Sequence, residues 1–467
     1  MSKIIYKSLG DWFRGNESVR IALAGSRYSG KSVFLTSLAS QLLNHDEKNC
    51  PLNGWKVCDD CIRDGRGAMV DGAFPDFKYE EARQMFAENG EWPSKTVDCS
   101  VWRRKLKLSK EEKGKRQIKK VYIEVMDLPG ERVADLSMTG SSYREWCKWV
   151  ENSFGGVDGY TKNFGKYFEA IKLCEDYNEI VAAYKRFIAD ELAMFALSIT
   201  PSIVKLDRTG RSMPRCRTAD EYLEAMKDRP LGVSLDFQFA PVPQSWFEDR
   251  GRRGITAKFK KGYDKYKDEV VNPIAGWLKS VNQVYYFVDI LGLLSRGPDV
   301  YNGELSFATA VLNQFGRDDS GNRLVRSISN VFSRFVKTTA DGVYVVAPKI
   351  DRVLPGKDRS NVENLAKRML SKVLDSLNVK SGVYTCAAVD TTYPTDDGVL
   401  QGRVRNKEGQ IVECKYRVAH IPDDWPESGD WKICNRWPET FPLFSKIRNR
   451  APRQNGLNVL IKKMFSI

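Results

Sequence analysis

The chain has 467 residues, enough for two or more domains or for one domain that carries a large insertion. Because no run approaches about 18 consecutive apolar residues and the first residues lack the apolar segment of a signal peptide, we expect a soluble, cytoplasmic protein. The ten cysteines are spaced irregularly, which favours reduced thiols over a disulfide framework. A net charge of +14 indicates an acidic partner, which leaves open a nucleotide, a nucleic acid, an anionic membrane or an acidic protein.

The first predicted elements are a strand and a helix joined by a glycine-rich turn. VRIALAG, residues 19–25, is an apolar run typical of a buried strand, and KSVFLTSLASQLL, residues 31–43, has near-helical apolar spacing. The turn between them, GSRYSGKS, fits the pattern G-x-x-x-x-G-K-[ST] in the strand-loop-helix context of a phosphate-binding loop. A strand-to-helix turn without a ligand is the alternative.

Each residue type in this turn has a physical reason. Gly30 lets the backbone approach a phosphate where a side chain would obstruct it, and the N–H groups of the loop converge on the anion. Lys31 can reach the β- and γ-phosphates, and the Ser32 hydroxyl can bind Mg²⁺. The predicted nucleotide contacts here are Gly25, Ser26, Arg27, Tyr28, Ser29, Gly30, Lys31, Ser32 and Val33.

Two strands with a short polar link, SKEEKGKRQ, are predicted at residues 97–108 and 119–131, and they suggest an antiparallel hairpin inside an α/β core. Asp127 lies at the tip of the second strand, where a carboxylate can hold the water shell of the metal, and the Gly130 N–H can sense the γ-phosphate. Thr96 is a candidate second hydroxyl ligand for Mg²⁺, with Ser94 as its competitor. An ordinary strand ending in a Pro-Gly turn is the alternative.

Strands are also predicted at residues 281–291 and 342–351, and the second ends in PKID. The stem of Lys349 can pack along a purine ring, and Asp351 can accept hydrogen bonds from guanine N1–H and N2–H₂. Pro348 stands where an asparagine is usual in such a base-reading segment. A charged strand end without this role is the alternative.

An amphipathic helix at residues 361–377 then leads to a strand at 382–392. The segment Cys386, Ala387 and Ala388 lies where a backbone N–H can meet guanine O6. This signal is weak alone, but its order after the other motifs favours a guanine nucleotide.

The segment from 131 to 278 predicts a largely helical insertion after the metal-holding turn, which could move with the nucleotide state. One expected helix face carries Ile180, Tyr184, Phe187, Leu192 and Phe195. After residue 393, alternation around NKEGQ predicts a β-hairpin. We expect Trp425, Trp431 and Trp437 in the tail to pack in the core rather than bind a ligand.

Two basic clusters stand out, residues 103–120 and 250–267. Each is more simply interpreted as a solvated face, with docking on anionic lipid or nucleic acid as the alternative. Cys50, Cys58 and Cys61 invite a zinc site, but neither His45 nor His420 completes a Cys-x-x-Cys pair at a finger spacing, so packing is the favoured interpretation.

The order of these motifs resembles the YcjX-like P-loop NTPase family, bacterial stress-associated proteins with a GTPase-type core. The resemblance runs from about residue 19 to the C-terminus, through GSRYSGKSVFLTSLASQLL, RDGRG, WPSKT, DLPGE, VYYFVDIL, PKID and DWPESGDWKICNRWPETFPLF. The family usually has Ser-Arg at Arg27 and Tyr28, and Thr-Lys-x-Asp where this chain has PKID. The resemblance implies binding of GTP or GDP with Mg²⁺, slow GTP hydrolysis and a stress-related role.

The fold expected from these signals is an α/β Ras-like core with a mostly parallel sheet, one antiparallel strand, a large helical insertion and a C-terminal extension. The expected limits are 1–18 for an N-terminal arm, 19–130 and 279–393 for the two core halves, 131–278 for the insertion, and 394–467 for the extension.

The expected catalytic residues are Lys31, Glu131, Arg27 and Thr96. Glu131 stands where Ras-like enzymes carry a water-orienting glutamine, and its negative charge beside the γ-phosphate predicts slow turnover. Arg27 could supply positive charge in cis. The alternatives are an ATPase of the same fold, since Pro348 weakens base recognition, and a nucleotide-stabilised scaffold on anionic membrane or, less favoured, nucleic acid. A protein partner of the insertion and peripheral contact with the inner membrane complete the expectations.

Overall fold

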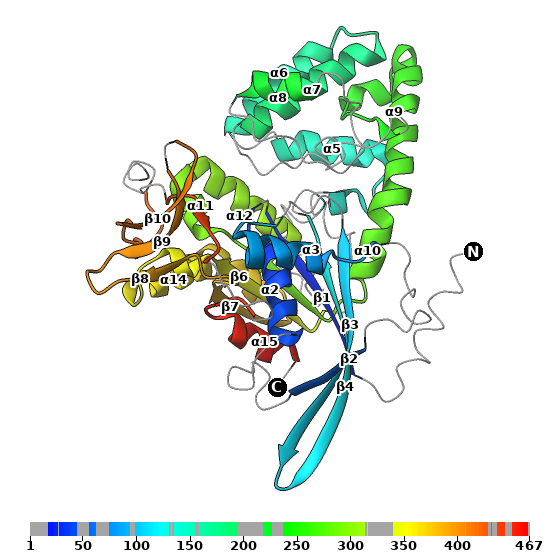
Figure 1. Ribbon diagram of the computed structural model, residues 1–467. Helices are drawn as coiled ribbons and strands as arrows, with labels where there is room; N and C mark the ends of the chain where they lie inside the picture. The colour runs from blue at the N-terminus through cyan, green and yellow to red at the C-terminus, as the bar shows by residue number, and fades with distance from the viewer. Residues whose placement is uncertain are drawn as a thin grey trace. The chain divides into compact units, whose positions relative to one another are not determined.

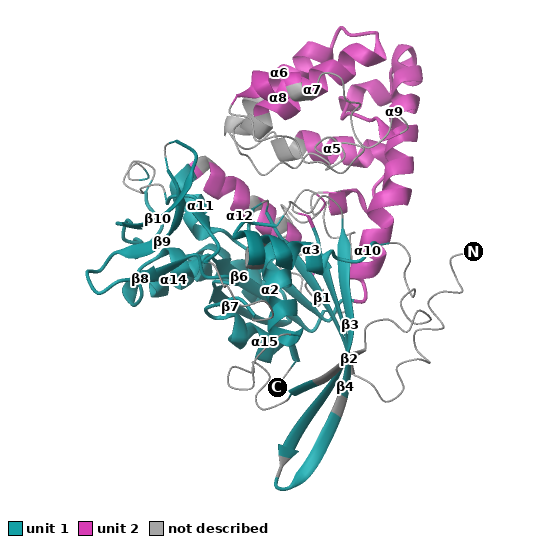
Figure 2. Ribbon diagram, viewed as in Figure 1, with its two compact units in different colours: residues 1–128, 281–297, 339–467 teal, residues 129–280, 298–338 magenta. Residues whose placement is uncertain are grey.

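The computed structural model describes residues 17–26, 28–43, 56–61, 74–93, 99–129, 132, 135–154, 158–193, 218–226, 237–312, 315, 340–406, 408–427, 431, 437–443 and 451–465. The chain divides into two compact units (Figure 2). Unit 1 comprises residues 1–128, 281–297 and 339–467, and unit 2 comprises residues 129–280 and 298–338. Within the described ranges, no helix has both the length and the apolar character needed to cross a bilayer.

Unit 1 is built on a seven-stranded sheet with the order β2-β3-β4-β1-β5-β6-β7 (Figure 1). Its strands are β1 (Glu17–Gly25), β2 (Lys56–Cys61), β3 (Ser100–Glu112), β4 (Lys115–Asp127), β5 (Gln283–Phe287), β6 (Gly342–Pro348) and β7 (Lys380–Cys386). From β4 to β7 along this order the neighbours pair in parallel, whereas β3 pairs antiparallel with both β2 and β4. The unit is therefore a mixed α/β fold with a mostly parallel sheet.

Helices cover this sheet and complete its core. They are α2 (Lys31–Leu43), α3 (Tyr79–Gln84) with the π-turn η2 (Met85–Asn89), α11 (Ile290–Arg296), α14 (Lys357–Ser376) and α15 (Leu457–Phe465). Fully buried Leu23 of β1 and Val125 of β4 share one apolar cluster with Phe34 of α2 and Ile461 of α15. α15 belongs to the predicted extension, residues 394–467, which was expected to pack on the core, and its apolar side chains lie in the core cluster of the sheet.

The β3–β4 hairpin exists, but its turn is much shorter than the sequence suggested. Residues 109–117 were expected to form a polar turn, whereas only Lys113 and Gly114 connect the strands. Both turn residues have positive φ, +51° and +74°, which is the geometry of a type I′ turn that matches the twist of a hairpin. The polar residues around this turn extend the two strands instead, because an exposed ribbon needs no buried face.

A small second sheet is formed by β8 (Thr392–Pro394), β9 (Leu400–Arg405), β10 (Ile411–Tyr416) and β11 (Thr440–Phe441). The predicted hairpin around NKEGQ is confirmed, because β9 and β10 pair antiparallel on either side of it. The strand predicted at 382–392 ends earlier, since β7 stops at Cys386. Trp425 and Trp431 stack with their ring centroids 5.9 Å apart, and the Trp425 indole N–H donates to the Leu365 carbonyl of α14 at 2.9 Å.

Unit 2 is helical in its described parts. Its helices are α5 (Tyr143–Phe154), α6 (Asp158–Ile171), α7 (Tyr177–Ala193), α8 (Ala219–Met226), α9 (Arg253–Tyr266), α10 (Asn272–Leu278) and α12 (Pro298–Leu312), with a π-helical turn η8 (Lys267–Val271) between α9 and α10. Its core is aromatic: the rings of Tyr143 and Trp146 each lie 5.5 Å from that of Tyr263. On α7, Tyr184 and Phe187 are buried as expected. Phe195 lies outside the described residues.

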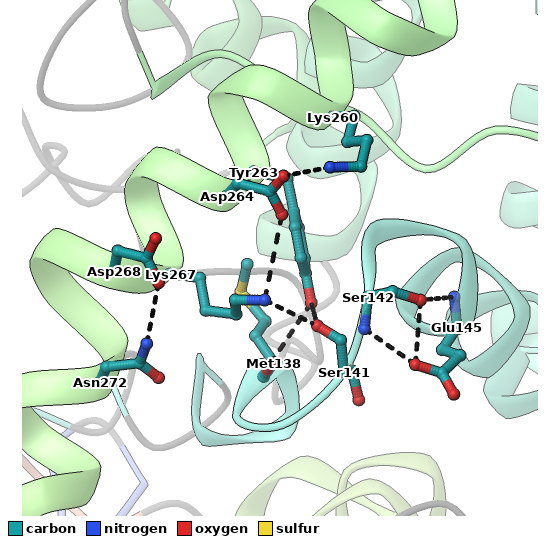
Figure 3. Close-up of polar contacts among 10 residues, drawn as sticks. All are labelled: Met138, Ser141, Ser142, Glu145, Lys260, Tyr263, Asp264, Lys267, Asp268 and Asn272. Carbon is teal, nitrogen blue, oxygen red and sulfur yellow. Dashed lines mark hydrogen bonds and ion pairs between the residues drawn. The ribbon is translucent and has the colours of Figure 1, made fainter.

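The segment that follows β4 in sequence is tied to α9 and to the start of η8 inside unit 2 (Figure 3). The Tyr263 hydroxyl and the Lys267 ammonium both donate to the Ser141 carbonyl, at 3.1 and 3.0 Å. The Ser142 N–H donates to the Glu145 carboxylate at 2.9 Å and the Glu145 N–H donates back to the Ser142 hydroxyl at 3.3 Å, which is a capping box at the start of α5.

Candidate functional site

The candidate site lies at the carboxyl edge of the parallel strands in unit 1. Because β1, β4, β5, β6 and β7 run in the same direction, the segments that leave them emerge at one edge of the sheet. Loops at this edge, outside the carboxyl ends of the strands, are where open α/β sheets bind ligands. The sequence motifs after β1, β4, β6 and β7 are thereby brought together by the topology.

The loop after β1 needs glycine at both ends of its pattern. Gly25 has φ +134°, and a Cβ there would lie 2.4 Å from the Phe287 carbonyl oxygen of the paired strand β5. Gly30 has φ +89°, a conformation that L side chains rarely adopt, although the nearest atom to a Cβ would be 3.9 Å away. Gly25 therefore allows close strand pairing, and Gly30 allows the backbone to turn into α2.

Lys31 starts α2 and folds back over this loop. Its Nζ donates to the carbonyl oxygens of Gly25 and Ser26 at 2.9 and 2.8 Å and to the Ser29 hydroxyl at 3.3 Å. The side chain is buried, with 6% of the residue exposed. Its positive charge is therefore held inside the loop, beside the N-terminus of a helix, where an anion is favoured. Tyr28, by contrast, is 53% exposed.

The structure brings Ser32 and Asp127 into direct contact. The Ser32 hydroxyl donates to Oδ2 of Asp127 at 2.6 Å, although the two residues are 95 positions apart. Asp127 is the last residue of β4, pairs in register with Leu23 of β1, and is fully buried. The sheet thus places this carboxylate beside the first turn of α2, where Val33 follows Ser32.

These groups fit a nucleotide phosphate chain with magnesium. An ammonium and a helix N-terminus suit phosphate oxygens, while a hydroxyl and a carboxylate are hard oxygen ligands of the kind Mg²⁺ takes. Gly30 leaves no Cβ in the loop where an anion would approach. Arg27, Thr96, Gly130 and Glu131, four further predicted contacts, lie outside the described residues.

In the segment predicted to contact the base, the structure adds a partner for Lys349. Lys349 has φ +66° and its ammonium forms an ion pair with Asp289, whose carboxylate also accepts the Gly292 N–H at 3.0 Å and so caps α11. Burial works to raise the pKa of Asp289, but the charge and hydrogen bond of Lys349, the Gly292 N–H and the charge of Arg352 together lower that pKa. Burial lowers the pKa of Lys349 despite the same pairing. Sequence reasoning missed Asp289, whose signal was an acidic residue before a helix.

Asp351 is buried and already holds two hydrogen bonds. Its Oδ2 accepts the N–H and the hydroxyl of Thr391, at 2.7 and 2.5 Å. Burial raises the pKa of this carboxyl even though the Thr391 bonds oppose the shift. The hydroxyl of Thr392 also donates to the Asp351 carbonyl. Sequence reasoning missed both threonines, which come from the segment that leads into β8.

The predicted segment at Cys386, Ala387 and Ala388 is held by distant parts of unit 1. The Ala387 N–H donates to the Asn455 carbonyl at 2.7 Å, and the Asn455 N–H returns a bond of 2.8 Å. The Ala388 carbonyl accepts the Ser37 hydroxyl at 2.5 Å. A contact with guanine O6 from this segment therefore has to come from a neighbour of Ala387. The same bridge closes the stretch 388–454, which is inserted between β7 and α15.

The architecture and these loops define a mixed α/β protein with a glycine-rich, lysine-bearing loop at the carboxyl edge of a mostly parallel sheet. Residues 19–192 and 226–458 match the model of the YcjX-like family, DUF463, and the chain belongs to this family. It is 30% identical over 411 residues to the Ras-like GTPase YcjX of Escherichia coli strain K12, covering 82% of this chain and 79% of that protein. It is 32% identical over 469 residues to the Ras-like GTPase YcjX of Shewanella oneidensis strain MR-1, covering 92% and 90%.

Proposed function

We propose that the protein binds a guanine nucleotide with Mg²⁺ in the loop of residues 25–32 and hydrolyses GTP slowly, as a nucleotide-dependent switch. The observation that carries this proposal is the 2.6 Å contact between Ser32 and Asp127, since it joins the two predicted metal-holding groups across the sheet. The name Ras-like GTPase that two relatives carry supports it.

In this proposal, one set of residues binds the phosphates and another binds the metal. Lys31 exchanges the carbonyl oxygens of Gly25 and Ser26 for phosphate oxygens, and the loop N–H groups bind the same anion. Ser32 and Asp127 would hold Mg²⁺, Asp127 through water, with Thr96 as a further ligand. When bound, the metal neutralises phosphate charge.

Slow hydrolysis is expected from the residues proposed to orient the attacking water and to offset the charge at the γ-phosphate. Glu131 orients the attacking water but adds negative charge beside the γ-phosphate, and Arg27 offsets that charge in cis. A substitution Arg27→Ala that leaves the single-turnover rate unchanged would remove Arg27 from the chemistry, with Lys31→Ala as the inactive control.

The output of the switch is proposed to pass through the segment that follows Gly130. Inside unit 2, the Arg132 guanidinium donates to the Tyr266 hydroxyl at 2.7 Å, and this hydroxyl donates to Asp135 at 2.6 Å. Arg132 and Asp135 are buried, so the start of this segment is fixed to the end of α9. Such anchoring supports transmission of a nucleotide-dependent shift to a protein partner of the helical unit. A role in bacterial stress responses stays a prediction from the family resemblance.

An ATPase of the same fold is the competing proposal. Pro348 lacks the side-chain amide of the usual asparagine, and the Ala387 N–H is engaged by Asn455, so two of the usual guanine contacts are altered. The guanine proposal rests on Asp351, which can accept from N1–H and N2–H₂.

Equilibrium binding of fluorescent GDP, ADP and xanthosine diphosphate to the wild type and to Asp351→Asn tests the base. We expect the wild type to prefer GDP, and Asp351→Asn to lose GDP affinity by about tenfold or more while gaining xanthosine diphosphate. Lys372→Gln, an exposed change on α14, is the matched control and should bind as the wild type does. Tighter binding of ADP than GDP by the wild type would replace the guanine proposal with the ATPase one.

A further inference from the structure

The β3–β4 hairpin extends beyond the sheet of unit 1 as a two-stranded ribbon (Figure 1). On one side, β2 pairs only with residues 105–109 of β3; on the other, β1 pairs with β4 only from Val121 onward. Among the described strands, residues 110–117 therefore pair only with one another, and residues 118–120 pair only with residues 107–109 of β3, at the base of this ribbon. This ribbon holds six lysines and arginines and two glutamates, so a charge of about +4 is concentrated on it.

The pairing register of β3 and β4 shows which residues of the ribbon, and of the strand segments at its base, share a face. Leu106 and Leu108 of β3 and Val121 of β4 are buried in the core cluster, so they define the inner face. Residues directly opposite share a face, and successive residues alternate. The outer face therefore carries the cross-strand pairs Lys105 and Tyr122, Lys107 and Lys120, Ser109 and Ile118, and Glu111 and Arg116.

Ile118 is unusual in this setting because it is apolar and exposed. It is 54% exposed, and Arg116 and Lys120 flank it on the same strand and the same face. Lys120 is exposed as well, and Lys107 is half-buried opposite it. The outer face thus combines cations, an aliphatic side chain and a half-buried tyrosine.

The cations of the ribbon differ from those of the second basic cluster. In unit 2, Lys258 lies over the Tyr177 ring, Lys260 pairs with Asp264, and Lys267 donates to Ser141, so that cluster is used in packing. Among the described side chains, by contrast, Lys107 at the base of the ribbon and Lys120 on it take part in no ion pair, although the register places Asp59 of β2 opposite Lys107. Lys120 is exposed, so its charge can face a partner.

We propose that the outer face of this ribbon docks on an anionic lipid bilayer. The cations would lie at the lipid phosphates, and Ile118 would enter the interface between headgroups and acyl chains. Nucleic acid would also attract the cations, but a duplex has to be unstacked to accept an aliphatic side chain, whereas the headgroup boundary of a bilayer accepts one without such a cost. The inference does not depend on nucleotide binding in the loop of residues 25–32.

The charge sets the size of the expected effect. Each lysine or arginine near an anionic membrane surface contributes roughly fivefold to partitioning, so Lys107→Gln with Lys120→Gln should weaken binding about 30-fold. Ile118→Ser should weaken it about tenfold, without changing its dependence on salt.

The experiment is sedimentation of the full chain with vesicles of phosphatidylglycerol and phosphatidylcholine in equal parts. We expect binding at about 50 mM salt that falls steeply by about 300 mM, and no binding to pure phosphatidylcholine vesicles. Lys372→Gln with Lys380→Gln removes two exposed cations from α14 and β7 and should bind as the wild type does. Val459→Ser is the matched control for Ile118→Ser, since Val459 is 55% exposed.

Circular dichroism and urea unfolding of each variant establish that it folds. Failure of the wild type to sediment with anionic vesicles at low salt overturns the proposal. The proposal is also overturned if Lys107→Gln with Lys120→Gln and the control Lys372→Gln with Lys380→Gln lose vesicle binding to the same extent. Binding to duplex DNA at a salt concentration at which vesicles are not bound, unaffected by Ile118→Ser, assigns the ribbon to nucleic acid instead.

Discussion

The two glycines of the loop between β1 and α2, Gly25 and Gly30, should respond differently to alanine. At Gly25, a Cβ would lie 2.4 Å from the Phe287 carbonyl oxygen and 2.9 Å from its nitrogen, so either β1 or β5 has to move. With the strain of φ +134°, we expect Gly25→Ala to lower the free energy of unfolding by about 3–5 kcal/mol. At Gly30 the nearest atom to a Cβ is 3.9 Å away, so only the positive φ is unfavourable, and Gly30→Ala should cost about 1–2 kcal/mol.

Urea unfolding without nucleotide, followed by tryptophan fluorescence, measures the difference between the two variants. Both should bind nucleotide poorly, because each changes the loop backbone, but only Gly25→Ala should unfold at clearly lower urea. Equal destabilisation of the two variants, or a stable Gly25→Ala, would refute the argument from the β1–β5 approach.

Two further changes probe buried charge on the base side of the site. Burial, together with the nearby Asp351 charge, raises the pKa of Asp390 to about 6. Because the folded state favours the protonated carboxyl, Asp390 stabilises the fold fully below about pH 4. This contribution, about 3 kcal/mol at most, is lost as the pH rises through about 6. Asp390→Asn should therefore gain stability relative to the wild type between pH 4 and 7 in urea unfolding, and a constant difference would contradict this. Lys349→Met should cost about 3 kcal/mol, since Asp289 keeps a buried charge without its cation. Adding Asp289→Asn should recover much of that loss, and simple additivity in the double variant would exclude the coupling.

Much of the core could be predicted from local patterns. The strand, loop and helix at the start of unit 1 follow from an apolar run, a glycine pattern and helical spacing. These features act over a few residues, as does the β9–β10 hairpin; the β3–β4 hairpin was predicted as well, but not its two-residue turn. The proximity of Ser32 and Asp127 could be predicted as well. The loop motif fixes Ser32 at the start of α2, shortly after β1, and Asp127 ends β4, which pairs with β1.

The contact partners that the sequence did not predict are far from the predicted residues along the chain. The partners of Lys349, Asp351 and Ala387 are Asp289, Thr391 and Asn455, which are 60, 40 and 68 positions away. No local pattern marks such partners, since an acidic residue before a helix or a threonine in a loop is common. The length of the β3–β4 ribbon was missed for a different reason: charged residues disfavour a buried strand but not an exposed one.

The central claim is that Ser32 and Asp127 together form a magnesium site for a bound nucleotide. Isothermal titration of GTP in the presence and absence of Mg²⁺, for the wild type and Ser32→Ala, tests it most directly. We expect Mg²⁺ to raise the affinity of the wild type by about tenfold or more, and Ser32→Ala to lose this gain while keeping its metal-free affinity. A wild type whose GTP affinity does not depend on Mg²⁺, or a Ser32→Ala variant with the full gain, would contradict the claim.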